Sequence, residues 1–366
     1  MIRYIGCSLS ELDTPFLWVD LDTMESNISY LSGYFKDAGV GWRPHTKGIK
    51  VPSIAHKLLE CGAIGVSCAK LSEAEVLVSA GIKDILIANQ IVGQSKIARL
   101  AHLQYRANII VAIDNFENAN YISKIANEIG ARIGALVEVD IGMHRCGTAP
   151  GNPAVKLAMQ INDLSGIELL GVMGWEGHVV DILDQELKEK TCLKAVESLV
   201  NTAEMIRMKG IDVPIVSCGG SGSYVVTAHI PGVTEIQAGG AVFGDLTYVK
   251  WGACTQCSLF VHSTVISRPT PARAIVDAGF KTMSGKVSTV SMPEVADISG
   301  VKLLGLDSEH GYLEIEYEKL QLSINDRVDF IVGYGDSTVF LHDYLAGVRG
   351  GKVEAVWEIQ GRGKLT

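Results

Sequence analysis

Residues 133–147 read IGALVEVDIGMHRCG, an apolar run that passes into a polar segment containing glycine. The run Ile133–Val139 has the length and composition of a strand that is buried on both faces. A helical pattern, Asn115–Glu128, precedes it. The same alternation of a short apolar run with an amphipathic stretch recurs over about residues 14–245. It predicts repeated strand–helix units.

The other apolar runs of this region share that length and composition. They are Phe16–Val19, Gly41–Pro44, Ile64–Cys68, Ile85–Ala88, Ile109–Ile113, Leu169–Met173, Ile215–Ser217 and Glu235–Gln237. Helical patterns lie between them, at Ser53–Glu60, Ser72–Ser79 and Glu186–Met208. Eight or nine such units favour an α/β fold of the (β/α)8 barrel type over an open sheet.

After about residue 250 the pattern changes to short strands joined by turns. The predicted strands are Leu259–Ser267, Ala272–Asp277, Tyr312–Tyr317, Arg327–Val332, His342–Val348 and Val353–Ile359. We therefore predict a barrel over residues 14–248 and a mainly β domain over residues 249–366, with residues 1–13 packing against the β domain.

Composition excludes several classes of function. The net charge is −9 and no basic run stands out, so a nucleic-acid partner is not expected. We expect no signal peptide, because Met1–Leu12 lacks a basic region followed by an apolar stretch. We expect no membrane partner, because the chain lacks an apolar run of the ~18 residues that a span needs. The eight cysteines are scattered, which predicts reduced thiols and a cytoplasmic protein. We interpret the lone Cys254-x-x-Cys257 pair as two small strand residues rather than a zinc site.

Two segments at predicted strand ends carry basic residues. Arg43-Pro44-His45-Thr46-Lys47 offers a lysine that a barrel mouth would partly desolvate, as a Schiff-base lysine requires. The alternative is a solvated surface lysine. The segment Asp140–Gly147 offers Arg145, whose guanidinium can hold a phenolate or a carboxylate, or can simply face solvent.

A glycine-rich segment, Cys218-Gly219-Gly220-Ser221-Gly222-Ser223-Tyr224, comes after another predicted strand. Closely spaced glycines expose backbone N–H groups to an anion, and serine hydroxyls can donate further hydrogen bonds. Gln237-Ala238-Gly239-Gly240, at the next strand end, can close the other side of the same pocket. The alternative for the glycine-rich segment is an ordinary flexible turn.

Two further segments combine aromatic and acidic residues. Trp175 and Glu176 can form a binding wall with an acid–base group, or a packed tryptophan beside a solvated carboxylate. Tyr334 and Asp336, between small residues of the β domain, can reach a neighbouring cleft, or form a hairpin turn. A lysine, an arginine and a phosphate cradle at one barrel mouth together suit an aldehyde cofactor that carries a phosphate.

At these residues the chain resembles the D-threonine aldolase and D-serine dehydratase family, the fold-type III group of pyridoxal-phosphate (PLP) enzymes with an alanine racemase-like barrel. The likeness runs nearly end to end. The matching motifs are Asp13-Thr14-Pro15, Val19-Asp20-Leu21-Asp22, Arg43–Lys47, Ser67-Cys68-Ala69-Lys70, Glu73-Ala74-Glu75, Asp84–Asn89, Asp140–Gly147, Asp277-Ala278-Gly279 and Glu309-His310-Gly311.

The resemblance implies a role for each candidate. Lys47 would carry PLP as a Schiff base, and Arg145 would lie near the phenolic oxygen of the cofactor. Gly219, Gly220 and Ser221 would hold the phosphate, with Gln237 and Gly239 on the far side of the pocket. The family is typically a homodimer with active sites near the subunit interface.

The chain departs from the family at two places. Family members usually have a Tyr-His pair where this chain has Trp175-Glu176. They also bind a divalent metal (Mg, Mn or Zn) through a His and a Cys or Asp two residues later, where this chain has Tyr334 and Asp336. Tyrosine is a poor ligand for zinc or manganese. The sequence therefore leaves open whether Asp336 binds an ion.

Three functions remain open from the sequence. The first is a PLP-dependent lyase that cleaves a carbon–carbon or carbon–oxygen bond of a small D-β-hydroxy-amino acid, with Lys47, Tyr334, Trp175 and Glu176 as candidate catalytic residues. The second is an amino-acid racemase or epimerase that uses Lys47 and Tyr334 as its two bases. The third is a PLP-binding protein without turnover.

Overall fold

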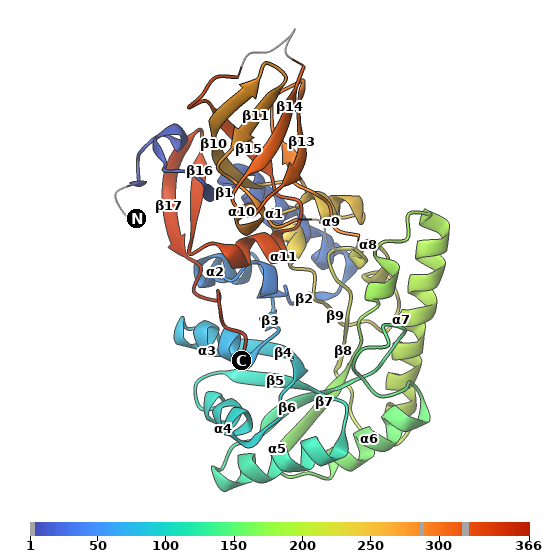
Figure 1. Ribbon diagram of the computed structural model, residues 1–366. Coiled ribbons are helices and arrows are strands. Elements are labelled where there is room, and N and C mark those ends of the chain that lie inside the picture. The colour runs from blue at the N-terminus through green and yellow to red at the C-terminus, as the bar shows by residue number, and fades with distance from the viewer. Residues whose placement is uncertain (1–3, 286–288, 317–321) are drawn as a thin grey trace.

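The structure is a computed structural model that describes residues 4–285, 289–316 and 322–366. It contains two sheets, one parallel and surrounded by helices, the other mainly antiparallel (Figure 1). Among the described residues, no helix is both long enough and apolar enough to cross a membrane.

The parallel sheet has eight strands. They are β2 (Gly41–Trp42), β3 (Val66–Cys68), β4 (Asp84–Gln90), β5 (Asn108–Ile113), β6 (Ile133–Glu138), β7 (Ile167–Met173), β8 (Ile215–Cys218) and β9 (Glu235–Ile236). Their order is β2-β9-β8-β7-β6-β5-β4-β3, so strands that are neighbours in sequence are neighbours in space. Every strand runs parallel to its neighbours.

Hydrogen bonds also join the two ends of this strand order. The Ile64 amide donates to Trp42 O at 2.9 Å and the Ser67 amide to Pro44 O at 3.0 Å. His45 and Ser67 form an isolated parallel bridge. The sheet therefore curls until its first and last strands meet, which confirms the predicted barrel.

Helices cover the outside of this sheet (Figure 1). Those around the barrel are α1 (Leu21–Ala38), α2 (Pro52–Glu60), α3 (Leu71–Ser79), α4 (Gln94–Leu103), α5 (Phe116–Glu128), α6 (Asn152–Asn162), α7 (Gln185–Arg207), α8 (Tyr224–Thr227) and α9 (Leu246–Lys250). Several begin at side-chain caps, since Asn115 accepts from the Asn118 amide at 3.0 Å and Asp184 from the Leu187 amide at 2.8 Å.

The second sheet forms the mainly β domain. Its strands are β1 (Phe16–Asp20), β10 (Leu259–Thr270), β11 (Arg273–Val276), β12 (Glu294–Val295), β13 (Val301–Leu306), β14 (Gly311–Ile315), β15 (Arg327–Ile331), β16 (Tyr344–Arg349) and β17 (Lys352–Glu358). Two short helices, α10 (Phe280–Met283) and α11 (Gly335–Thr338), interrupt it. The predicted strand Tyr312–Tyr317 corresponds to β14, while Tyr317 lies outside the described residues.

The first predicted barrel strand belongs elsewhere. β1 pairs with β10 in antiparallel and with β16 in parallel register, so the prediction that Phe16–Val19 joins the barrel is wrong. A buried strand is a short apolar run in either kind of sheet, and the run alone therefore does not reveal its partners. The N-terminal segment lies on this domain too, where the Gly6 amide donates to Val353 O at 2.8 Å and the Leu9 amide to Gly351 O at 2.9 Å.

One end of the barrel is closed by a buried group of charges. Arg43, just after β2, donates through Nε to both carboxylate oxygens of Glu235 at 3.0 Å and through Nη1 to Asp84. Burial alone would lower the pKa of Arg43, but the two carboxylates outweigh it and raise that pKa. A side chain at Gly65 would collide with this group, because its Cβ would clash with the Arg43 guanidinium. This charged group therefore belongs to the packing of the fold at this end of the barrel.

Candidate active site

A cavity of about 430 Å³ lies at the carboxyl ends of the barrel strands. Its lining residues lie at the ends of β4, β6 and β7 and in the segments that follow β2, β3, β6, β7, β8 and β9, and α9 and the β domain complete it. The cavity is within the size range of small-molecule sites, and this end of a barrel is where such sites form.

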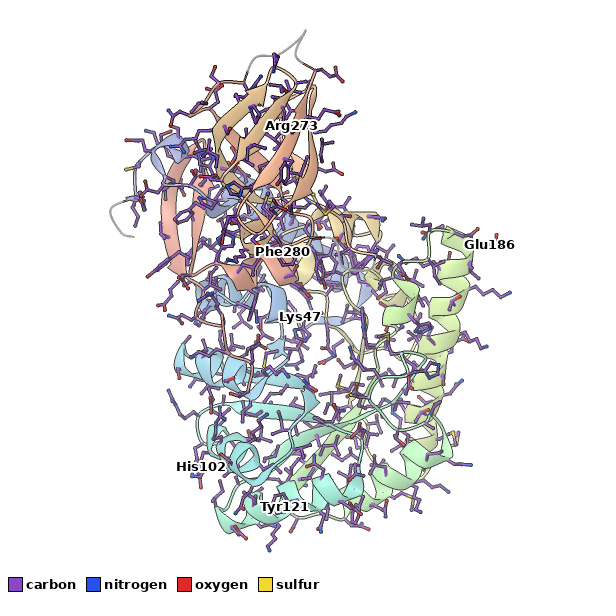
Figure 2. The ribbon with its side chains drawn as sticks, in the orientation of Figure 1. Lys47, His102, Tyr121, Glu186, Arg273 and Phe280 are labelled. Atoms are coloured by element: carbon purple, nitrogen blue, oxygen red, sulfur yellow. The ribbon has the colours of Figure 1, made fainter. Side chains whose placement is uncertain are left out.

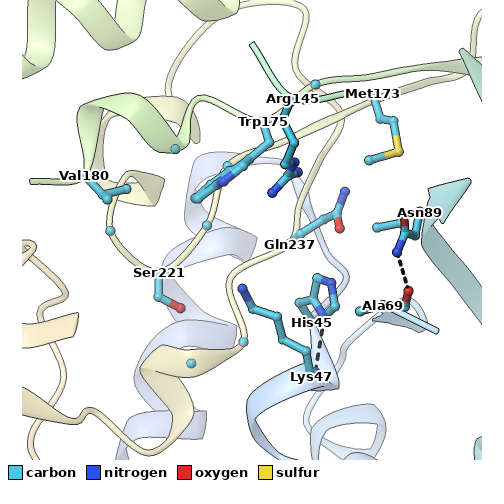
Figure 3. Close-up of a pocket in the computed structure, with 18 of the residues that line it drawn as sticks. His45, Lys47, Ala69, Asn89, Arg145, Met173, Trp175, Val180, Ser221 and Gln237 are labelled. Atoms are coloured by element: carbon cyan, nitrogen blue, oxygen red, sulfur yellow. Dashed lines mark hydrogen bonds between the residues drawn. The ribbon is translucent and has the colours of Figure 1, made fainter. Parts of the chain in front are cut away.

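Lys47 extends into this cavity from a short 3-10 helix, η3 (Thr46–Gly48) (Figure 3). It lies between the barrel strands and the β domain (Figure 2). Its Nζ is 3.1 Å from Asp336 Oδ2, an ion pair between the two domains. Gly48 makes this approach possible, because a Cβ there would clash with Asp336 Oδ1.

Two tyrosines share the Asp336 carboxylate. Tyr334 donates to Oδ2 and Tyr248 to Oδ1, each at 3.1 Å. Burial alone would raise the pKa of Asp336, but the Lys47 charge and the hydrogen bonds from Lys47 and Tyr334 outweigh it and lower that pKa. Burial and the Asp336 charge raise the pKa of both tyrosines. The cluster therefore holds an ionised carboxylate and neutral phenols at neutral pH.

A second carboxylate, Asp245, positions the helices that carry Tyr248 and Asp336. Asp245 accepts from the Tyr248 amide at 2.8 Å and from the Gly335 amide at 2.6 Å, so it links α9 to α11. Burial raises the pKa of Asp245 to about 8, although these hydrogen bonds oppose the shift.

His45 lies beside Lys47 and lines the same cavity. Its Nδ1 accepts from the Lys47 amide at 3.2 Å. Burial and the charge of Lys47 lower the pKa of His45 to about 3, which makes it a neutral imidazole. His45 therefore adds no positive charge to the cavity at neutral pH.

Part of the cavity lining is made of backbone, and we call it the glycine wall: residues Gly219–Gly222 together with Gly239, which packs on His45, and Gly240. Among the described residues, no acceptor bonds to the amide N–H groups of Ser221, Gly222 and Gly240. The Ser221 hydroxyl accepts from the Ala241 amide at 2.8 Å and joins the two halves of the wall. Unpaired N–H groups that line a cavity fit an anion such as phosphate.

Trp175, Arg145 and Gln237 enter the cavity from the side facing Lys47 (Figure 3). Trp175 packs on the glycine wall so closely that a Cβ at Gly220 would clash with its ring. Gln237 Nε2 donates to Ser217 Oγ at 3.0 Å. The structure thus brings together at one cavity the predicted residues Lys47, Arg145, Trp175, Gly219, Gly220, Ser221, Gln237, Gly239 and Tyr334.

Glu176 lies elsewhere, behind the glycine wall, with its side chain fully buried. Its carboxylate accepts from the Ser223 hydroxyl at 2.6 Å and from the Gly219 amide at 3.3 Å. Burial raises the pKa of Glu176 against these hydrogen bonds. A catalytic role for Glu176 stays a prediction, and its contacts favour a structural one.

Several lining residues were not assigned a role from the sequence. They are His45, Ala69, Ala88, Asn89, Gln90, Glu138, Cys146, Met173, Gly174, Gly177, Val180, Tyr248 and Trp251. Asn89, Gln90 and Glu138 stand at strand ends, where the barrel rule could have found them. Tyr248 and Trp251 lie beyond the last barrel strand, and only the packing of the β domain brings them to the cavity.

The metal position implied by the family resemblance does not fit an ion here. The oxygens of Asp336 already accept from Lys47, Tyr334 and Tyr248. Within residues 4–285, 289–316 and 322–366, no three His, Cys, Asp or Glu side chains are grouped so that they could hold a metal ion. Tyr334 is also a poor ligand for zinc or manganese.

Residues 19–247 match the family "Alanine racemase, N-terminal domain", and residues 258–348 match "Putative serine dehydratase domain". A D-threonine aldolase from Arthrobacter sp is 35% identical over 362 residues, which cover 98% of this chain and 95% of that protein. The chain belongs to the D-threonine aldolase and D-serine dehydratase family.

Other members of this family cover the chain equally well. A 3-hydroxy-D-aspartate aldolase from Paracoccus denitrificans (strain Pd 1222) is 32% identical over 98% of this chain and 94% of that protein. The crystal structure of a D-threonine aldolase from Filomicrobium marinum superposes with a TM-score of 0.95 at 32% identity and covers 99% of both chains. The family likeness therefore includes both domains.

Proposed function

We propose that this protein is a PLP-dependent lyase that breaks the Cα–Cβ bond of a small D-β-hydroxy-amino acid. The observation that carries the proposal is that one cavity contains the Lys47 amine, beside an ionised carboxylate, and a wall of free backbone N–H groups. The aldolases among its relatives support the choice of reaction.

The residues present fit PLP. Lys47 supplies the amine that binds an aldehyde, and the free amides of Ser221, Gly222 and Gly240 suit its phosphate. Arg145 lines the cavity and supplies a cation for a phenolate or a carboxylate. When bound, PLP supplies an electron sink for the bond that breaks at the α-carbon.

The side chains around Lys47 would handle protons. Aldol cleavage transfers the proton of the β-hydroxyl to a base, breaks the Cα–Cβ bond, releases an aldehyde and leaves Cα to be protonated. Asp336 is ionised and lies 3.1 Å from Lys47 Nζ, so the pair can take up and return these protons. Tyr334 orients the same carboxylate oxygen with its hydroxyl.

The geometry is less suited to racemisation. A racemase needs one base on each face of the α-carbon, but Lys47 Nζ and the Tyr334 hydroxyl both lie 3.1 Å from one oxygen of Asp336. An α-carbon midway between them would compete with that oxygen for space. The arrangement therefore leaves no room for an α-carbon between the two groups while both contact Asp336.

Reduction and product analysis together test the proposal. Borohydride treatment of PLP-loaded protein should leave a pyridoxyl adduct on Lys47, found by peptide mass spectrometry. D-Threonine and D-phenylserine should yield glycine and the matching aldehyde. Release of ammonia and a keto acid would indicate dehydration instead, and exchange of the α-hydrogen with inversion alone would indicate racemisation. A visible absorption band that no amino acid changes would support a PLP-binding protein without turnover and reject an enzyme.

We also propose that the protein acts as a cytoplasmic homodimer. All eight cysteines are free thiols, as expected in a reducing compartment. Light scattering of the PLP-loaded protein should give twice the chain mass of 39.3 kDa. A monomer at micromolar concentration would contradict the dimer.

A further inference from the structure

We propose that Glu176 is a positioning residue that shapes the glycine wall from behind and thereby selects a phosphorylated cofactor over its unphosphorylated form. This inference rests on the proposed function, because it takes PLP as the ligand. It assigns Glu176 a role that does not require contact with the substrate.

The carboxylate of Glu176 is committed to the glycine wall. It is fully buried, and in the part of the chain that the structure describes no lysine, arginine or histidine forms an ion pair with it. Its two oxygens accept separately, one from the Ser223 hydroxyl at 2.6 Å and one from the Gly219 amide at 3.3 Å. A buried carboxyl group is tolerated only where such hydrogen bonds satisfy it. The position of the Glu176 carboxylate and the position of the glycine wall are therefore coupled.

Ser223 connects the Glu176 carboxylate to the next amide of the glycine wall, that of Gly220. Its Oγ accepts from the Gly220 amide at 3.1 Å while it donates to Glu176. The amides of Gly219 and Gly220 thus point to the brace formed by Glu176 and Ser223. The following two amides, Ser221 and Gly222, are left without protein acceptors among the described residues. The brace therefore determines which N–H groups of the wall are available to an anion.

Trp175, the residue before Glu176, contacts the glycine wall from the cavity side. Trp175 lies against Gly220, where a Cβ would clash with the ring. The dipeptide Trp175-Glu176 consequently holds this backbone between an aromatic ring and a buried carboxylate. Pyridoxal without a phosphate would gain little from the arrangement, because it has no anionic group for the free amides of Ser221 and Gly222 to bind. Figure 3 shows Trp175 and Ser221 at this cavity together with Lys47.

The test compares the affinities of apoprotein for PLP and for pyridoxal. The variants are Glu176→Ala, Glu176→Gln and Ser223→Ala, with Glu168→Gln, an exposed position on β7, as the matched control. Dissociation constants come from absorbance titration. The phosphorus NMR signal of bound PLP gives a readout that does not depend on turnover.

We expect Glu176→Ala and Ser223→Ala to weaken PLP binding by about 10-fold or more, since each removes a buried hydrogen-bond partner. Pyridoxal binding should change by less than about 2-fold. Glu176→Gln keeps an acceptor for Ser223 and should lose less than Glu176→Ala. The phosphorus signal should shift toward that of free PLP in the alanine variants only.

Equal weakening of PLP and pyridoxal in these variants, or no weakening of either, would overturn the inference. If Glu176→Ala does not fold, the same comparison in Glu176→Gln and Ser223→Ala decides it. Wild-type protein that binds neither ligand would overturn the proposed function, and this inference with it. A wild type that binds PLP while the variants show no selective loss would overturn the inference alone.

Discussion

Arg43 and Lys47 belong to the same five-residue segment, yet they lie in opposite environments. Arg43 is 4% exposed and its guanidinium is shared between Glu235 and Asp84. The Lys47 side chain is 45% exposed to the cavity and pairs with Asp336 alone among the described acids. Between these two residues the chain passes from the end of the barrel that the Arg43 group occupies to the end where the cavity lies.

This difference in environment distinguishes a charged residue that stabilises the fold, Arg43, from a charged residue that can react with a ligand, Lys47. Arg43 and Glu235 are buried, and Asp84, which is partly exposed, contacts the same guanidinium, so Arg43 is hard to displace. Lys47 faces a space that a ligand can fill, and its partner comes from the other domain. Loss of Arg43 should therefore reduce stability, and loss of Lys47 should reduce activity.

The largest expected effect is on activity. Lys47→Ala removes the amine that would bind the cofactor, and should lower kcat by about 10³-fold or more. Borohydride should then leave no adduct at this position, while the protein stays folded. Lys57→Ala, which breaks a surface pair with Glu25, is the control and should keep its activity. Wild-type turnover in Lys47→Ala would contradict the assignment.

The next effect is on stability. Arg43→Ala leaves Glu235 and Asp84 without their cation and should reduce the free energy of unfolding by about 3–5 kcal/mol. Denaturant unfolding measures this. Arg99→Ala breaks an exposed pair with Glu75 and should cost at most about 1 kcal/mol. Similar losses of unfolding free energy in Arg43→Ala and Arg99→Ala would mean that the ion pairs of Arg43 do not stabilise this end of the barrel.

Asp336→Asn should affect both properties, because its carboxylate joins the two domains. We expect kcat to fall by about 10- to 100-fold, as for the loss of a charged hydrogen-bond partner. Asp343→Asn, on an exposed pair with Arg362, is the control.

The pKa of Asp336 also predicts a difference in acid stability. Because that pKa is lowered in the folded protein, its ionised form contributes stability above the pKa of the unfolded chain. This contribution is lost as the pH falls through the folded pKa. Wild type should therefore lose more Tm than Asp336→Asn on acidification below about pH 4. Parallel Tm curves for the two proteins would refute the shift.

Tyr334→Phe should have a smaller effect, since it removes one of three donors to Asp336. We expect kcat to fall by about 2- to 10-fold, which corresponds to a neutral hydrogen bond of about 0.5–1.5 kcal/mol. Tyr344→Phe, at a position 36% exposed on the surface, is the control. A loss as large as that of Lys47→Ala would instead support Tyr334 as an essential base, as the racemase hypothesis requires.

The smallest effect should come from removal of divalent cations. EDTA should change activity by less than about 2-fold, because the oxygens of Asp336 are already hydrogen-bonded. Complete loss with EDTA, restored by manganese or zinc, would show that an ion displaces these donors. Activity with and without EDTA, followed by metal add-back, is the measurement.

Much of the fold could be predicted from local pattern. Runs such as Ile109–Ile113 and Ile133–Val139 became adjacent parallel strands β5 and β6, because a strand buried on both faces must be apolar throughout. Lys47, Arg145 and the glycine wall were predicted because a barrel presents the loop after each strand at one end. These features depend on residues that are close together in the sequence, so the local pattern is enough to predict them.

Other features required the tertiary structure. The apolar run Phe16–Val19 could pair in either sheet, and only the antiparallel partner β10 settles its place. Glu176 is one position beyond a lining residue, yet the chain directs its carboxylate behind the glycine wall. Tyr248 and Tyr334 meet on Asp336 only after the β domain closes over the barrel. Periodicity and composition describe a residue and its neighbours in sequence, whereas partners far apart in the chain are chosen by how whole sheets and helices pack.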